Sequence, residues 1–546
     1  MRFVSTLSTV FVCTLLSACG GGGGDSSGNG SVDVGYTPYA CSAAIYNKAN
    51  ELRIYQVMTE AFIDSDGEGY GVGYGTSHHR GDIQGITNSL QYIKDLGMNA
   101  VWLTPVFESV ALNGQDLSAQ RLDATGYFAS NYFGLDPEFG TIEDARELVN
   151  KAHELGMYVF FDGVFGHFKQ NADDYPSPDG INLSTTGADQ ATTGREAVYP
   201  KDLAFFKEVA SYWVREVKID GWRLDQAYQV PVGAWGEIRK AVEEASADVT
   251  YQLDGNTVNP LGYMVAEIWS GEERIASDAY GEAASPGLCS AFDFPMRYRI
   301  VQAFAGEESG VDSRNASTLE SGYQTHDRYP DYAVPNGFIT NHDLVRFGDL
   351  LQREGLANPS DTEYWDRYQA AYAFLAAYSG PITLYYGEEI GDQVDGFDDK
   401  VNGDCASVGL CDDHVARTSA KIEGLASEPG RAAFSANSNQ EMLRNRIADL
   451  MTIRSEHPAL YRGSRSHIVS SEGEALYIDY KVAEDDQVLF VVNLTSDIRT
   501  MHLDIMDVDG NRKLTDLESS EVFNAIGDRV TIEVQPLQAR FFEVLP

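Results

Sequence analysis

Four apolar segments of this chain carry acidic residues at their ends, and this repeated pattern constrains the fold more than any other feature. The segments are MYVFFD ending at Asp162, IDGWRLD ending at Asp225, YMVAEIW carrying Glu267, and GFITNHD ending at Asp343. Apolar segments of this length, separated by helical patterns, are typical of buried parallel strands. Charged side chains at their ends predict a closed (β/α)8 barrel, in which the strand ends converge on one pocket.

An aspartate after a strand is also a common helix N-cap, so one such ending would indicate little. Here the four carboxylates are accompanied by Arg223, His167 and His342, which lie beside the same segment ends. Four separate helix caps do not explain that combination of residues. We therefore interpret the strand ends as a catalytic pocket.

The length of the chain predicts more than one domain. Its 546 residues exceed a barrel of roughly 250 to 400 residues, so we expect a smaller domain beside it. We place the barrel at residues 39–463, with a polar insertion near residues 168–200 that forms a short domain B after the third strand. Alternating apolar segments over residues 464–546 predict an antiparallel β-sandwich. The expected fold class is α/β with this C-terminal β-sandwich.

The charge balance limits the class of partner. The chain has 82 acidic and 40 basic residues, a formal net charge of −42. Nucleic-acid binding requires a basic surface, so we exclude nucleic acid as a partner. An acidic surface is compatible with a neutral substrate. We expect a monomer, and the sequence contains no motif that indicates an organic cofactor.

The first residues have the layout of a bacterial lipoprotein signal peptide. Arg2 precedes a short apolar run that ends in Leu-Ser-Ala-Cys at Cys19, which is similar to a lipobox. We expect residues 1–18 to be removed, Cys19 to be lipidated, and residues 19–38 to form a Gly/Ser-rich tether. Gly20 after the cysteine predicts an outer-membrane lipoprotein of the cell envelope, periplasmic or surface-facing, with secretion as the alternative. The lipid anchor is the only membrane contact that we expect.

Four cysteines lie outside this leader. They can pair in three ways in an oxidising compartment. A bond between Cys405 and Cys411 would close a short loop, and one between Cys41 and Cys289 would tie the N-terminal segment to the barrel. Free, buried thiols remain an alternative for Cys41 and Cys289.

An acidic, glycine-rich loop follows the first predicted strand. Asp64, Asp66 and Glu68 alternate with small residues, and Asp82 follows in the next segment. Oxygen ligands spaced in this way suit Ca²⁺, because glycines let the chain fold tightly around the ion. A solvated turn without a metal is the alternative.

Several short motifs occur in a fixed order along the chain. They are DGVFGH from Asp162, GWRLD from Gly221, EIW from Glu267 and NHD from Asn341, with Gly126-Tyr127 and YYGEEIG as further matches. Together they resemble the α-amylase family of glycoside hydrolases, family 13, over most of residues 50–546. The resemblance implies a catalytic barrel, a domain B after the third strand and a C-terminal β-sandwich.

The resemblance implies that Asp225 is the nucleophile, Glu267 the general acid/base, and Asp343 a third carboxylate that binds substrate hydroxyls. This agrees with chemistry, since an oxocarbenium-like transition state needs an anion on one face and a proton donor at the leaving oxygen. Arg223 lies two residues before Asp225, on the same face of a strand, and can keep that carboxylate ionised.

The resemblance also implies sugar-binding roles at the cleavage subsite. His167 and His342 match histidines that hydrogen-bond the sugar, Asp162 matches a residue that supports it, and Tyr127 matches a tyrosine that stacks on its ring. A packing role stays open for each histidine, and a core position stays open for Tyr127.

The chain departs from the family pattern at four positions. Gly166 stands where the family usually has an asparagine that helps to bind calcium between the barrel and domain B. We therefore expect no calcium at that family site. Thr125 replaces a sugar-binding histidine, and Tyr228 and Gln229 replace a Lys-His pair on the leaving-group side. These replacements leave the linkage preference open.

These features predict a retaining glycoside hydrolase that cleaves α-1,4-glucosidic bonds in starch-like glucans or maltooligosaccharides. An exo-acting or α-1,6-acting glucosidase, or a transglycosylase, would use the same residues. A non-catalytic glucan-binding lipoprotein is a further alternative. The joint presence of Asp225, Glu267 and Asp343 argues against it, because a binding protein needs no nucleophile paired with an acid.

Overall fold

The computed structural model describes residues 41, 48–72, 75–109, 123–191, 193–305, 314–356, 359–394, 396–401 and 415–546. The predicted signal peptide, Cys19 and the tether lie outside these residues, as do Cys405 and Cys411. Within the described part, no helix is both long and apolar enough to cross a lipid bilayer.

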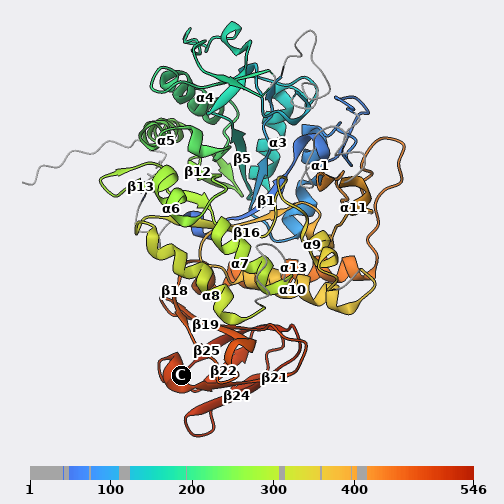
Figure 1. Cartoon of the computed structure of the whole chain (residues 1–546), viewed down its shortest axis with the longest axis vertical. Helices are drawn as coiled ribbons and strands as arrows, with labels where there is room; N and C mark the ends of the chain where they lie inside the picture. Colours follow the sequence, from blue (N-terminus) through green and yellow to red (C-terminus); the bar gives the residue numbers. More distant parts are fainter. Residues whose placement is uncertain are drawn as a thin grey trace, which may run out of the picture. The chain divides into compact units, whose positions relative to one another are not determined.

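A closed barrel of eight parallel strands lies at the centre of the described chain (Figure 1). Around the ring, each strand pairs with its predecessor and successor, and the last strand pairs with the first. The strands are β1 Arg53–Val57, β2 Ala100–Leu103, β5 Tyr158–Gly163, β9 Gly221–Leu224, β12 Tyr263–Ala266, β15 Ser290–Phe292, β16 Val334–Phe338 and β17 Ile382–Tyr385.

The strands are mostly apolar because both of their faces are buried. Alternate side chains point into the barrel, where Ile54, Trp102, Phe160 and Val265 belong to one interior cluster. The residues between them point outward and join the much larger core beneath the helices. Most of the charged side chains on these strands therefore lie at the strand ends.

Amphipathic helices form the outer layer around the strands. Asp82 caps the first of them by accepting a hydrogen bond from the Gly85 backbone N–H at 2.6 Å, and Thr141 and Asp144 form a capping box at the next. The longer helices are α1 Ile83–Asp95, α3 Ile142–Glu154, α4 Leu203–Glu216, α5 Val232–Ala247, α7 Phe294–Phe304, α8 Ala316–Gln324, α10 Thr362–Ala376 and α13 Ser438–Glu456. Shorter ones are α6 Glu272–Ile275, α9 Phe347–Arg353, α11 Phe397–Lys400 and α14 Pro458–Arg462.

The predicted α/β barrel with a C-terminal antiparallel domain is confirmed, but the seventh strand lies earlier than the apolar run indicates. The run predicts a strand over residues 337–340, whereas β16 is Val334–Phe338. Asn336 is satisfied inside the barrel, where its side chain donates to the Tyr263 hydroxyl at 3.1 Å and accepts from Thr383 at 2.9 Å. Because its side chain is hydrogen-bonded, Asn336 can lie in a buried strand, although a polar residue does not predict one.

The insertion after the third barrel strand forms a small antiparallel sheet. Its described strands are β6 His167–Lys169, β7 Asp189–Gln190 and β8 Gly194–Glu196, with β8 in the middle. β6 begins only four residues after β5 ends, so the insertion starts at the rim of the pocket.

The C-terminal residues form two antiparallel sheets that share an apolar core. One sheet has six strands in the order β18-β19-β20-β25-β22-β23, and the other pairs β21 with β24. The strands are β18 Ser464–His467, β19 Leu476–Ala483, β20 Asp486–Asn493, β21 Arg499–Asp504, β22 Lys513–Asp516, β23 Val522–Asn524, β24 Arg529–Val534 and β25 Ala539–Leu545.

Polar contacts join this domain to the barrel. The buried Lys481 ammonium donates to the Leu460 carbonyl at 3.0 Å and to the Ser379 hydroxyl at 2.8 Å. Arg465 contacts Glu320 of α8 at 2.7 Å.

A disulfide bond joins Cys41 to Cys289. The sequence left open whether these two cysteines are bonded or are free thiols. In the structure they are bonded, and the bond ties the N-terminal segment to the barrel. Cys289 directly precedes β15, so the bond lies at the amino ends of the strands.

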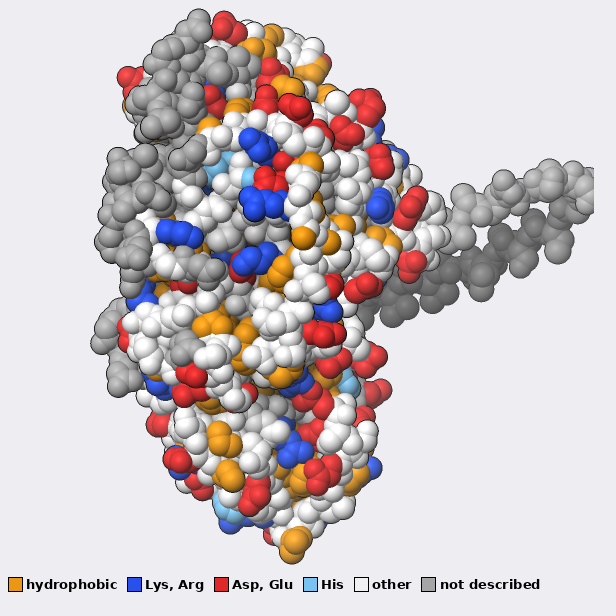
Figure 2. All heavy atoms as spheres, turned by 90° about the vertical axis from the view of Figure 1, so that its right-hand side faces the viewer, with side chains coloured by type: hydrophobic (Ala, Val, Ile, Leu, Met, Phe, Trp, Pro, Cys, Tyr) orange, Lys and Arg blue, Asp and Glu red, His pale blue; other side chains and the backbone are white. Residues whose placement is uncertain are grey.

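Acidic side chains are spread over the face of the molecule in Figure 2 and are not gathered in one patch. A few lysine and arginine side chains lie among them. This distribution fits the net charge of −42 and favours solubility.

Candidate active site

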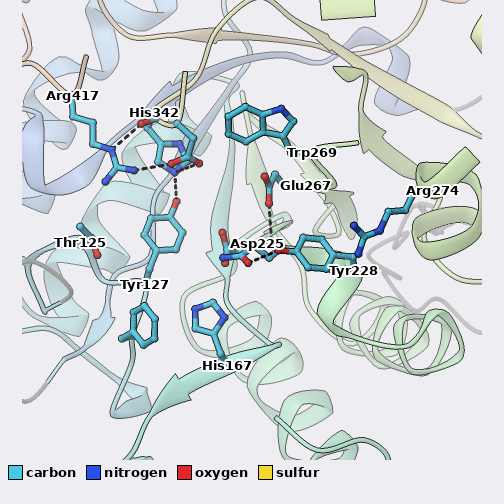
Figure 3. Close-up of a pocket in the computed structure, with 13 residues that line it drawn as sticks. Thr125, Tyr127, His167, Asp225, Tyr228, Glu267, Trp269, Arg274, His342 and Arg417 are labelled. Atoms are coloured by element: carbon cyan, nitrogen blue, oxygen red, sulfur yellow. Dashed lines mark hydrogen bonds and ion pairs between the residues drawn. The ribbon is translucent and has the colours of Figure 1, made fainter. Parts of the chain in front are cut away.

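A pocket of about 620 Å³ opens at the carboxyl ends of the barrel strands (Figure 3). Asp225 and Glu267 directly follow β9 and β12, and Asp343 lies five residues beyond β16. Ligands bind at this end of barrels because the loops there carry side chains from several strands. The lining residues are Thr125, Tyr127, Phe128, His167, Asp225, Gln226, Tyr228, Glu267, Trp269, Arg274, His342, Asp343 and Arg417.

The guanidinium of Arg223 lies beneath this pocket and contacts three carboxylates. Its Nη1 is 2.8 and 2.9 Å from the two oxygens of Asp162 and 3.0 Å from Asp225 Oδ1. Its Nη2 is 3.7 Å from Glu267 Oε2. Arg223 is 1% exposed, so these charges interact with little screening by water.

The two candidate catalytic carboxyl groups are neighbours in the sheet register. Leu224 of β9 pairs with Ala266 of β12, and the Glu267 backbone N–H donates to the Leu224 carbonyl at 2.9 Å. Asp225 and Glu267 are the next residues on the two strands. Both carboxyl groups contact the same guanidinium.

Their surroundings differ in a way that suits two different roles. Burial raises the pKa of Glu267 to about 8, with Arg223 lowering it and Asp225 and Asp343 raising it further. Asp225 instead has one oxygen 3.0 Å from Arg223 Nη1. At neutral pH Glu267 therefore keeps its proton and can act as an acid.

The backbone after Asp225 also contacts Glu267. Gln226 has a left-handed conformation with φ of 38°, which is uncommon for a residue other than glycine. In this conformation its backbone N–H donates to Glu267 Oε2 at 2.8 Å. The strained residue therefore orients the acid.

The predicted sugar-binding residues Tyr127, Asp162 and His342 form one hydrogen-bonded network. The Tyr127 hydroxyl donates to Asp162 Oδ2 at 2.9 Å and lies 2.6 Å from His342 Nε2. The two rings are stacked, with centroids 5.5 Å apart. Tyr127 lines the pocket, so the network is held in place where a sugar would bind.

His342 and Asp343 are fixed from behind by residues of two other segments. Gln56 Nε2 of β1 lies 2.7 Å from His342 Nδ1. Arg417 donates to the His342 carbonyl at 2.8 Å and to Asp343 Oδ1 at 2.7 Å. His342 Nε2 is also 3.2 Å from Asp343 Oδ2.

His167 lies on the other side of the pocket, at the start of β6 (Figure 3). It is buried, its ring centroid lies 4.7 Å from that of Phe128, and its Nδ1 lies 2.8 Å from Gln229 Oε1. All the predicted catalytic and sugar-binding residues are thus brought to one site.

The leaving-group side of the pocket is built from exposed rings. Trp269 is 48% exposed and stacks on Phe294 at 5.9 Å between ring centroids, while its indole N–H donates to the Tyr298 hydroxyl at 2.7 Å. Tyr228 is 38% exposed, and the Arg274 guanidinium lies 4.4 Å from the centre of its ring. Both rings face the cavity beside Glu267 (Figure 3).

Several of these residues were not predicted from the sequence, among them Gln56, Arg274 and Arg417. Gln56 is a polar residue inside the apolar strand β1, and that interruption was a usable signal. Arg417 lies in the long segment after β17, and Arg274 lies in a short helix. No spacing pattern distinguishes these two arginines, because only the folded loops bring them to the pocket.

Three of the four predicted metal ligands lie together. Asp64, Asp66 and Asp82 each place a carboxylate oxygen within 4.8 Å of the others, and Glu68 is not part of the group. Asp82 accepts backbone hydrogen bonds from Ser65 and Gly85. Among the described residues, the buried Asp64 Oδ2 has no hydrogen-bond partner, so a cation ligand position fits there.

Comparisons with known proteins agree with this geometry. The catalytic-domain family of alpha amylase matches residues 56–178 and 198–453. Cyclomaltodextrinase of Thermoanaerobacter pseudethanolicus is 29% identical over 335 residues, which are 57% of this chain and 51% of that protein. Neopullulanase 2 of Thermoactinomyces vulgaris is 24% identical over 528 residues, which are 90% of this chain and 77% of that protein.

Solved structures of high similarity extend the comparison to the whole fold. The crystal structure of AmyP in complex with maltose is 53% identical, with a TM-score of 0.86 over 92% of this chain and 98% of that chain. An AmyP variant in complex with maltotriose is 52% identical at the same TM-score. The chain spans about half the length of several curated relatives, among them the cyclomaltodextrinase and an intracellular maltogenic amylase of Bacillus subtilis. The matched family covers more than half of the residues, and the chain belongs to the α-amylase family.

Proposed function

We propose that this protein is a retaining glycoside hydrolase that cleaves α-1,4-glucosidic bonds in starch-like glucans or maltooligosaccharides. The observation that carries the proposal is the pair of Asp225 and Glu267, at equivalent positions after neighbouring strands. Neighbouring strands lie about 4.8 Å apart, and retaining glycosidases separate their two carboxyl groups by about 5–5.5 Å. The register therefore supports retention over inversion.

In the first step, the Asp225 carboxylate attacks the anomeric carbon while Glu267 gives its proton to the leaving glycosidic oxygen. This needs an ionised Asp225 and a protonated Glu267. Arg223 supports the former, and burial, which raises the pKa of Glu267 to about 8, supports the latter.

In the second step, the Glu267 carboxylate takes a proton from water, and the hydroxide oxygen attacks the anomeric carbon and releases Asp225. Glu267 is then protonated again, so the site returns to its starting state. His342 and Asp343 hold the sugar hydroxyls in both steps and Tyr127 stacks on the sugar ring. The three residues lie in one fixed network.

The similar proteins support the choice of substrate class. AmyP is solved with maltose and maltotriose, and the curated relatives include a cyclomaltodextrinase and maltogenic amylases. Trp269 and Tyr228 on the leaving-group side offer flat apolar faces suited to sugar rings.

The test is a timed product analysis on amylose, pullulan, maltotriose and sucrose, beside Asp225→Asn. Short maltooligosaccharides of retained α-configuration from amylose, absent in the variant, are expected. Products from maltotriose or sucrose alone would move the assignment to an exo-acting glucosidase. Glucan binding without any turnover would indicate a non-catalytic binding protein.

Transglycosylation is a second candidate, favoured by the exposed rings beside Glu267. A sugar held on Trp269 and Tyr228 competes with water for the covalent intermediate. High concentrations of maltose are then expected to yield products longer than the substrate. Products that never exceed the substrate in length would restrict the chain to hydrolysis.

We also propose that Asp64, Asp66 and Asp82 bind Ca²⁺, which would stabilise the loop they share. If so, EDTA lowers the Tm of the wild-type chain but not that of Asp64→Asn, because a ligand stabilises only the state that binds it. An unchanged wild-type Tm would favour the solvated turn.

The lipid anchor at Cys19 and the envelope location are proposals from the sequence. Palmitate labelling of the wild-type chain and of Cys19→Ser tests them. Label on the wild-type chain alone is expected, and a secreted, unlabelled wild-type chain would contradict the anchor.

A further inference from the structure

The side chain of Gln229 lies against the backbone of Gly166. Gln229 ends the turn of 3-10 helix at Ala227–Gln229, and Gly166 directly precedes β6. A Cβ atom at position 166 would lie 2.2 Å from Gln229 Oε1 and 2.5 Å from Gln229 Cβ. Any residue other than glycine at position 166 would therefore displace Gln229.

Gln229 connects His167 to Gln226 through hydrogen bonds. Its Oε1 lies 2.8 Å from His167 Nδ1, and its Nε2 donates to Gln226 Oε1 at 3.0 Å. The Tyr228 hydroxyl donates to the same Gln226 oxygen at 2.7 Å. Because Gln226 also donates its backbone N–H to Glu267, this amide chain joins His167 to the segment that orients the acid.

We propose that Gln229 is a positioning residue that fixes the ring and the tautomer of His167. With the Gln229 carbonyl oxygen facing Nδ1, that nitrogen carries the proton and Nε2 is a hydrogen-bond acceptor for a sugar hydroxyl. The sugar-binding part of this inference rests on the proposed function. The tautomer itself does not require a substrate.

Among the residues that the structure describes, the same geometry leaves no ligand set for the calcium ion that the family implies between the barrel and domain B. Gly166 has no side-chain donor where the family has asparagine, and the Gln229 carbonyl oxygen is used by His167. The residues present do not fit that ion. Gly166 and Gln229 together connect the start of domain B at His167 to the segment that follows Asp225.

Four variants of the full chain separate a positioning role from simple packing. Gln229→Leu removes both hydrogen bonds at similar size, and Gln229→Glu keeps an acceptor oxygen. Gly166→Ala displaces Gln229 without changing it. Gln252→Leu, on an exposed hairpin strand, is the matched control.

The kinetic measurement is kcat and KM on maltotriose, with Tm recorded for each variant. Gln229→Leu is expected to lower kcat/KM about 10- to 100-fold, the effect of an unpaired buried polar group. Gln229→Glu is expected to recover at least tenfold of that loss. Gly166→Ala is expected to lower kcat/KM by a similar factor. Combined with Gln229→Leu in a double variant, it is expected to lower kcat/KM little further. Wild-type kcat/KM in Gln229→Leu, or independent losses in the double variant, would overturn the proposal.

The spectroscopic measurement uses ¹⁵N-labelled histidine, with the signals of His167 identified by their absence in His167→Asn. A protonated Nδ1 and an acceptor Nε2 are expected in the wild-type chain and in Gln229→Glu, and a changed or mixed tautomer in Gln229→Leu. An Nε2–H tautomer in the wild-type chain would overturn the proposal. This measurement decides the inference even if the wild-type chain turns over no glucan, which would contradict only the proposed function.

The absence of a junction ion is tested with the same signals. In Asp64→Asn, which removes the other proposed cation site, EDTA is expected to leave the His167 signals unchanged. A shift of those signals on adding EDTA would place an ion at the junction and overturn this part of the inference.

Discussion

The two sides of the pocket differ in how firmly they are held. Asp162, Arg223 and His342 are each at most 1% exposed, whereas Tyr228 and Trp269 are 38% and 48% exposed. The buried residues contact one another through charges and short hydrogen bonds. Tyr228 has the Arg274 guanidinium over its ring and donates its hydroxyl to Gln226. Trp269 contacts the Phe294 ring and the Tyr298 hydroxyl.

This difference separates the chemistry from the choice of substrate. The buried side is set by the barrel strands, where a change in one side chain leaves a charge without its partner. The exposed side is set by loops, where a ring can be exchanged without cost to the core. We expect variants on the two sides to differ in the same way.

The largest effect is expected at the two catalytic carboxyl groups. Asp225→Asn is expected to reduce kcat by about 10⁴-fold or more, and Glu267→Gln by about 10²–10⁴-fold, as measured on maltotriose. Asp485→Asn, at an exposed turn, is the control. Residual activity of Asp225→Asn within tenfold of the wild type would remove Asp225 from its assigned role.

Breaking the buried charge network is expected to have the next largest effect. Arg223→Met leaves the Asp162 carboxylate, which is 0% exposed, without its cation. We expect a loss of about 3–5 kcal/mol in the free energy of unfolding, measured by urea denaturation. Arg274→Met on the exposed side is the matched variant, and an equal loss in both would contradict the contrast between the two sides.

Changes on the exposed side are expected to be smaller and to spare stability. Trp269→Ala and Tyr228→Ala each remove one ring face, worth about 0.5–1.5 kcal/mol, so KM should rise about two- to tenfold. In the same variants, the ratio of transfer to hydrolysis should decrease, as measured by product lengths at high maltose concentration. A decrease in Tm comparable to that of Arg223→Met would show that these rings carry the fold.

The pH dependence of stability tests the buried side without a kinetic measurement. The folded-state pKa of Glu267 is about 8, above the ordinary value of 4.5, so the folded chain holds this proton more tightly than the unfolded chain. Its contribution to stability is present below pH 4.5 and is lost as pH rises toward 8. Glu267→Gln has no such pH-dependent loss of stability. The Tm of this variant minus the Tm of the wild type should therefore increase from pH 5 to pH 9. A constant difference would place the pKa of Glu267 near its ordinary value.

The sequence predicted the pocket residues at strand ends far better than those carried by loops. Strand ends are visible as apolar runs that stop at a charge, so Asp162, Asp225 and Glu267 could be found before the fold was known. Arg417 and Arg274 could not, because each reaches the pocket through a loop or short helix whose path depends on tertiary packing. The metal loop lies between these cases, since three of its four carboxylates meet and Glu68 does not.

The bond between Cys41 and Cys289 lies at the end of the barrel opposite the pocket. Cys289 stands at the amino end of β15, and the pocket opens at the carboxyl ends of the same strands. Whatever precedes Cys41 is therefore attached at the base of the barrel. A force applied to the chain before Cys41 therefore acts on a covalent bond at this base, and the strand ends that carry the pocket lie at the other end of the barrel.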